Sequence, residues 1–172
     1  DVDLGMRYLD VGSLKPTESL VIPEITLPVC NPQYLGDVLL GKGKKRTPTL
    51  ISMDNQEREW ASAFETTGRT VNTLVFSDYA VVVQAALLGQ GMALGWLNVI
   101  SNSLCKGELV PAVDACRVTS RRCCLVVPAN RPVRPVVENV RDWIIEEMHA
   151  DMLKIDALYP HLGLASILES YR

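Results

Sequence analysis

The chain has 172 residues, 48% of them hydrophobic, which is enough for one large domain or two small lobes. Its formal net charge is −3, and this acidic balance argues against a segment that grips nucleic acid by itself, because phosphate binding needs a basic patch. The longest apolar stretch, residues 79–88, is far shorter than the ~20 residues that a membrane-spanning helix requires.

The first thirty residues indicate extended structure. Residues 2–8 alternate between apolar and polar side chains, which predicts a strand, and residues 10–19 predict a loop. Residues 20–29 are strand-like, but Pro23 and Pro28 lack the backbone N–H that a sheet ladder uses. We therefore expect an edge strand or an irregular extended path at residues 20–29.

The next stretch predicts a helix start, a polar crossover and a strand. Asn31 and Pro32 suit the cap and the first position of a helix. The glycine-rich residues 36–47 are polar and predict a crossover between lobes, and residues 49–53 predict a short strand.

A further helix is expected to start at a cap residue, Asp54 or Asn55, and to run through Thr67. Its inner face would carry Trp60, Ala63 and Phe64. Residues 71–76 predict the next strand. Helices that alternate with short apolar strands indicate parallel pairing with right-handed crossovers.

The rest of the chain is organised around residues 76–97. Ser77 or Asp78 can cap a helix over 79–88, which is apolar enough to be buried on most sides. Glycines at 89 and 91 end this helix, and residues 92–97 predict a strand covered on both faces.

The C-terminal part predicts a weak helical turn over 98–106, a turn and short extended piece over 107–111, and a strand over 121–127. A long helix follows over 136–152, with Trp143 in its core-facing stripe, and a short helix is expected over 162–168.

The sequence shows no pattern for catalysis, for a metal or for a cofactor. The two histidines do not share a helix face, and the five cysteines form no C-x-x-C pair. The glycines at 89 and 91 lie between helix and strand, which is the wrong order for a dinucleotide fingerprint. We therefore expect no enzyme, no metal site and no cofactor.

Strand ends remain as the candidate binding positions. Ligands of open α/β sheets bind outside the carboxyl ends of the strands, where helix N-termini offer free N–H groups. Asp54 follows one predicted strand, and Ser77 and Asp78 follow the next. A plain helix cap is the alternative interpretation for Ser77 and Asp78, and core or hinge packing is the alternative for Trp96. For Arg7 and Tyr8, at the end of the first predicted strand, the alternative is a surface strand end without a binding role.

Four stretches resemble the effector-binding domains of LysR-type transcriptional regulators in order and spacing. They are residues 2–8 (VDLGMRY), residues 27–35 (LPVCNPQYL), the alanine pair and glycine-x-glycine within 76–96, and GELV at 107–110 followed by a strand and the Trp143 helix. Together these stretches extend over nearly the whole chain.

The resemblance implies an α/β fold of the periplasmic-binding-protein kind, with mostly parallel sheets in two lobes around an effector cleft. We expect an incomplete first lobe in residues 1–47 and 120–172, and a second lobe in residues 48–119. Ligand-binding residues would be Tyr8, Asp54, Ser77 and Asp78, with Arg7 and Trp96 at the hinge or cleft edge.

The resemblance further implies a small-molecule effector, a homodimer or homotetramer, a cytoplasmic location without a membrane, and DNA contact through a domain that this chain lacks. The main alternative is a solute-binding receptor of a transport system, which shares the two-lobed fold. An enzyme on a related scaffold would need a converging acid, base or nucleophile.

Overall fold

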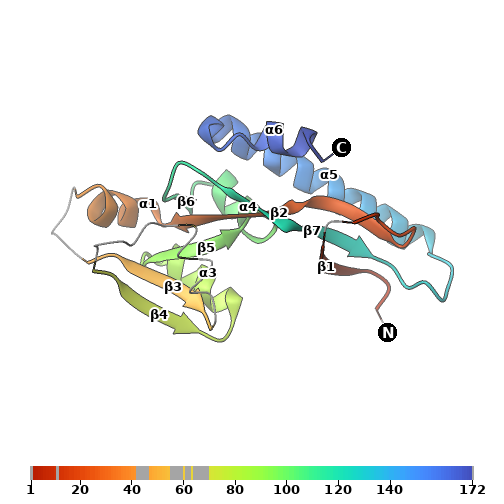
Figure 1. Ribbon diagram of the computed structural model, residues 1–172, viewed down its shortest axis with the longest axis horizontal. Coiled ribbons are helices and arrows are strands. Elements are labelled where there is room, and N and C mark those ends of the chain that lie inside the picture. Colours follow the sequence, from red (N-terminus) through yellow and green to blue (C-terminus); the bar gives the residue numbers. More distant parts are fainter. Residues whose placement is uncertain are drawn as a thin grey trace. The chain divides into compact units, whose positions relative to one another are not determined.

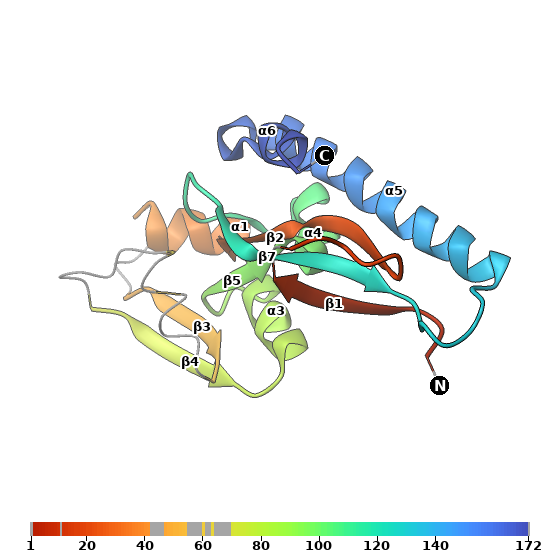
Figure 2. The same cartoon turned by 45° about the vertical axis from the view of Figure 1, so that its right-hand side comes forward.

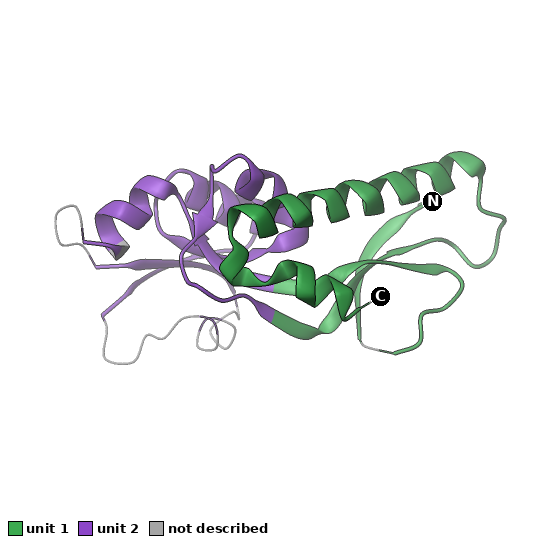
Figure 3. Ribbon diagram, turned by 90° about the horizontal axis from the view of Figure 1, so that it is seen from above, with its two compact units in different colours: residues 1–25, 118–172 green, residues 26–117 purple. Residues whose placement is uncertain are grey.

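The computed structural model describes residues 2–10, 12–41, 47–54, 60, 63 and 70–171. The chain divides into two compact units (Figure 3): unit 1 comprises Asp1–Ile25 and Val118–Arg172, and unit 2 comprises Thr26–Arg117. The lobes expected from the sequence differ from these units over residues 26–47, which belong to unit 2, and over residues 118–119, which belong to unit 1. The lobes themselves remain a prediction.

Unit 1 is built on strands in the order β1–β7–β2 (Figure 2). Their bounds are Gly5–Asp10 for β1, Glu18–Cys30 for β2 and Arg117–Val126 for β7. β1 runs antiparallel to β7, with Tyr8 opposite Cys123. The strands expected near residues 2–8 and 121–127 are thus confirmed, with shifted ends.

β2 corrects the expectation for residues 20–29, because it is one long strand with hydrogen-bonded neighbours on both sides. It pairs with β7 in unit 1, and its last residues pair with β5 and β6 in unit 2. A proline keeps its carbonyl acceptor, and that of Pro28 accepts the Ala112 N–H at 2.8 Å. The edge placement was therefore wrong.

Unit 1 is completed by α5 (Pro135–Leu158), the 3-10 turn η2 (Pro160–Leu162) and α6 (Leu164–Glu169). The long helix is confirmed, but Trp143 is 60% exposed, so its assignment to the core was wrong. The buried positions of α5 are Val137, Met152 and Ile155. The helix is therefore turned so that a neighbouring stripe, and not the one through Trp143, meets the sheet.

Unit 2 contains three strands that follow β2 in the order β5–β3–β4 (Figure 1). β3 is parallel to both β4 and β5, which confirms the predicted parallel pairing. The elements of unit 2 are α1 (Pro32–Tyr34), the π-helix η1 (Leu35–Leu39), β3 (Thr49–Met53), β4 (Asn72–Phe76), α3 (Tyr79–Leu87), β5 (Met92–Trp96), α4 (Leu97–Cys105) and β6 (Val110–Pro111).

Two helices of unit 2 differ from expectation. α3 buries only one face, through Val82, Ala85 and Ala86, so the prediction of burial on most sides was wrong. α4 is a full helix and not a weak turn, because Leu97, Ile100 and Leu104 repeat at helical spacing on its buried face. The remaining helix, predicted between Asp54 and Thr67, lies outside the described residues apart from Asp54, Trp60 and Ala63.

Trp60 is buried in the core of unit 2, as expected for that side chain. Cys30, Leu94 and other buried residues belong to the same core cluster. Asn31 caps α1, since its Oδ1 accepts the Gln33 N–H at 2.9 Å, which confirms the predicted helix start. A side chain at Gly91 would force its neighbours to shift, because a Cβ there would lie 2.6 Å from the Thr49 carbonyl oxygen.

Candidate functional site

The strongest candidate site is the edge of unit 2 where its parallel strands end. Met53 of β3 lies opposite Phe76 of β4, and Ile51 of β3 lies opposite Ala93 of β5. Continued past these pairs, the same registers bring Asp54, Ser77 and Trp96 level with one another. Neighbouring strands are about 4.8 Å apart, so the three positions span roughly 10 Å.

Asp78 caps α3 at this edge. Its Oδ1 accepts the Ala80 N–H at 2.8 Å, and its own backbone is extended. The expected choice of Ser77 or Asp78 as cap is thereby resolved in favour of Asp78. Ser77 is exposed and directly precedes this cap residue in the chain.

Tyr79 ties the start of α3 to the end of β5. Its hydroxyl donates to the Leu94 carbonyl at 3.1 Å and accepts the Trp96 N–H at 3.0 Å. The Tyr79 and Trp96 rings meet edge to face, with centroids 5.1 Å apart. The end of β5 and the start of α3, which follows β4, are therefore held in a fixed arrangement. The sequence did not predict this link, because Tyr79 was assigned only to the helix.

Trp96 also precedes α4, and no side chain caps that helix. The N–H groups of the first turn of α4 lie at the same edge as Ser77 and Asp54, and they favour an oxygen acceptor. On the other side of β5, Thr26 of β2 lies opposite Trp96 and lines a cavity of about 240 Å³ within unit 2. Asp114 and Arg117 line the same cavity.

Arg7 and Tyr8 lie on β1, which belongs to unit 1, whereas the strand-end edge belongs to unit 2. The guanidinium of Arg121 stands over the Tyr8 ring, 5.4 Å from its centroid. Arg121 also holds Glu24 with two hydrogen bonds, from Nε at 2.9 Å and from Nη2 at 2.7 Å. Thr119 donates to the same carboxylate, which is 1% exposed.

This cluster of Glu24, Thr119, Arg121 and Tyr8 was not expected from the sequence. Glu24 stands between apolar residues of β2, and that single acidic position was the only available signal. The register of β1 on β7 pairs Tyr8 with Cys123 and Asp10 with Arg121, so that Tyr8 and Arg121 are diagonal neighbours. The structure thus groups Asp54, Ser77, Asp78 and Trp96 in unit 2 and describes Arg7 and Tyr8 separately in unit 1.

The five cysteines are all present as thiols, and burial governs their chemistry. Burial raises the pKa of both Cys30 and Cys123 to about 12, with the neighbouring Cys124 and Glu24 adding to the effect on Cys123. Burial also raises the pKa of Cys116. Within the described parts of the chain, no group of three His, Cys, Asp or Glu side chains could hold a metal ion, and no helix is long and apolar enough to cross a membrane.

Comparison with known protein families gives a match to the model described as "LysR substrate binding domain". It covers residues 50–149, from the second residue of β3 through β4, α3 and β5 into α5. No curated protein matches the chain.

Several solved structures share the fold. The effector-binding domain of AmpR from Citrobacter freundii is 19% identical with a TM-score of 0.57, covering 87% of this chain and 76% of that one. The regulatory domain of CrgA from Neisseria meningitidis is 15% identical with a TM-score of 0.55, covering 86% and 76%. Full-length LysG from Corynebacterium glutamicum, solved with bound effector Arg, is 11% identical with a TM-score of 0.51, covering 83% and 50%.

Proposed function

The chain belongs to the LysR substrate-binding-domain family, and on this premise we propose that the strand-end edge of unit 2 senses a small polar metabolite. The family assignment makes the chain a ligand-sensing regulatory domain with the α/β fold of periplasmic binding proteins. The solute-binding receptor is not favoured, because the solved relatives are domains of transcriptional regulators.

One observation carries the proposal: the register brings Asp54, Ser77 and Trp96 level at the carboxyl ends of three parallel strands. This edge offers a carboxylate acceptor at Asp54, a hydroxyl at Ser77 and the uncapped N–H groups of α4. A ligand with both a donor group and an acceptor group matches that set. Amino acids are one such class, and the LysG structure carries bound Arg.

Tyr79 gives the edge the rigidity that sensing needs. Because its hydroxyl joins α3 to β5, a ligand that contacts Ser77 and Trp96 acts on two connected elements. Binding then favours whichever arrangement of the domain holds the ligand more tightly, which is a shift between pre-existing states. The location of the effector in a cleft between lobes, with Tyr8 and Arg7 contributing, remains a prediction.

The test is a binding screen by calorimetry with the twenty amino acids and their small carboxylate analogues, followed by the Ser77→Ala variant. Loss of a hydrogen bond to a charged ligand group costs about 1.5 kcal/mol or more, so affinity should fall roughly ten-fold or more. Thr73→Ala is the matched control, since Thr73 is an exposed residue of β4 away from this edge. An unchanged affinity in Ser77→Ala would remove Ser77 from the site.

The wider regulatory context is also a proposal. We infer a homodimer or homotetramer, a cytoplasmic location, and control of transcription through a DNA-binding domain outside the residues of this sequence. No catalytic step is proposed for the strand-end edge. Size-exclusion chromatography with light scattering, with and without ligand, measures the oligomer directly.

A further inference from the structure

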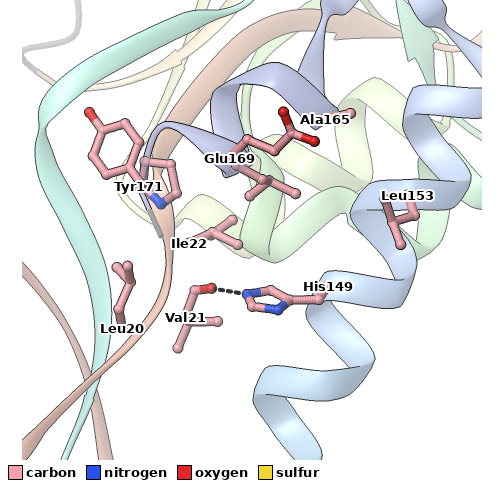
Figure 4. A pocket seen from close by; sticks show the side chains of 10 residues that line it. Leu20, Val21, Ile22, His149, Leu153, Ala165, Glu169 and Tyr171 are labelled. Carbon is pink, nitrogen blue, oxygen red and sulfur yellow. Dashed lines mark hydrogen bonds between the residues drawn. The ribbon is translucent and has the colours of Figure 1, made fainter.

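Unit 1 contains a second, separate cavity of about 240 Å³ (Figure 4). Its floor is the start of β2, including Val21 and Ile22, and its walls come from α5 and α6. His149 of α5 reaches across to β2, where its Nε2 donates to the Val21 carbonyl at 2.8 Å (Figure 4). The backbone N–H of Ala165 donates to Asp156 at 3.1 Å, which holds α6 on α5.

The lining of this cavity is apolar with one charge. Aliphatic side chains predominate, and Leu153, which is 58% exposed, lies on the wall with its surface uncovered. Among the described residues of the lining, Glu169 of α6 is the only carboxylate, and none is a lysine or an arginine. Within the same described part of the chain, no hydrogen bond or ion pair engages the Glu169 carboxylate.

These features define the chemistry of an occupant. An apolar cavity of 150 Å³ holds benzene, so this one suits a body of about ten non-hydrogen atoms. Glu169 is the one carboxylate among the described lining residues, and it favours a protonated amine over an anion at this wall. The Arg122 guanidinium does not line the cavity but stands over the ring of Tyr171, 5.9 Å from its centroid. Because Nε2 of His149 already donates to Val21, the imidazole can offer its Nδ1 to the same occupant.

We infer that this cavity is a binding site for a small aromatic or branched aliphatic amine, whose apolar body lies between β2, α5 and α6 and whose ammonium group pairs with Glu169. The site is independent of the strand-end edge in unit 2. A bound amine would cover Leu153 and Tyr171 and would hold α6 against the rest of unit 1.

Calorimetric titration of the whole chain with 2-phenylethylamine tests this site, with 3-phenylpropionate as the anion of similar shape. The amine should bind about ten-fold more tightly than the carboxylate, as expected for a charge-assisted hydrogen bond. Glu169→Gln should remove that preference by weakening the amine about ten-fold. Ala165→Phe should fill the cavity and abolish binding of both probes.

Two control variants establish that the amine binds in this cavity and through Glu169. Glu146→Gln removes another exposed carboxylate, on α5, that does not line the cavity, and it should leave amine affinity unchanged. Ser77→Ala should also leave it unchanged, so that failure here is distinct from failure of the strand-end site. Equal affinity for the two probes, an unchanged affinity in a folded Glu169→Gln variant, or no binding of the amine at millimolar concentration would each overturn the inference.

Discussion

Replacing Arg121 by methionine removes two hydrogen bonds to the buried carboxylate of Glu24. The carboxylate is 1% exposed and would keep Thr119 as a donor. Removing one partner of a fully buried ion pair costs about 3–5 kcal/mol. The Arg121 side chain is 48% exposed, so solvent already weakens the pair, and we expect about 2–3 kcal/mol.

Amide hydrogen exchange measures this loss where it occurs. A cost of about 2–3 kcal/mol corresponds to exchange roughly 30- to 150-fold faster in β2 residues 19–25 and in β7, while β5 in unit 2 serves as the internal reference. The double change Glu24→Leu with Arg121→Met removes both charges and should recover most of the protection. Protection in Arg121→Met within a factor of three of the parent would refute this role of Arg121 at Glu24.

Three further predictions concern packing, hydrogen bonding and pH. Gly91→Ala should lower the free energy of unfolding, measured in urea, by about 1–3 kcal/mol, because its Cβ meets the Thr49 carbonyl. An unchanged urea midpoint would mean that β3 shifts to accept the Cβ at little cost. Tyr79→Phe should lower the free energy of unfolding by about 1–3 kcal/mol, because the Leu94 carbonyl and the Trp96 N–H lose their hydrogen bonds to the hydroxyl. A variant as stable as the parent would contradict this role of Tyr79. The raised pKa values of Cys30 and Cys123, from 9.0 to about 12, mean that the unfolded chain loses these protons first as pH rises. The contribution of these thiols to the free energy of unfolding should be constant below pH 9. Between pH 9 and 12 it should fall by up to about 1.4 kcal/mol per pH unit for each thiol. The free energy of unfolding of Cys123→Ala should fall less steeply with pH, and a slope equal to that of the parent would contradict the assignment.

The parallel core of unit 2 was predictable from the sequence because local signals agree with one another there. Cap residues, helical spacing and glycine stops mark the same boundaries around α3 and β5, and short apolar runs mark β3 and β4. The strand-end positions of Asp54 and Ser77 followed from this order of elements. Their level placement with Trp96 needed the register, which no local pattern specifies.

The errors arose where distant partners decide the outcome. Pro28 is accommodated within the sheet because its carbonyl finds Ala112, a partner far along the chain. Trp143 belongs to an apolar stripe of α5, but the sheet meets the neighbouring stripe of that helix. The Glu24 cluster and the cavity beside His149 likewise join segments that are 97 and 128 residues apart in the sequence, so no spacing rule could have assembled them.

The division of unit 1 between residues 1–25 and 118–172 has a consequence for how the protein is made. Unit 2 is continuous in sequence and can fold as it leaves the ribosome, whereas β1 must wait for β7, since Gly5 pairs with Val126. During that interval the start of β2 lacks β7, the strand beside which it lies in the folded protein. Pro23 and Glu24, in the middle of the segment LVIPEITL, interrupt an otherwise apolar β-run, and a proline or a charge at such a place lowers the tendency of an exposed strand to aggregate.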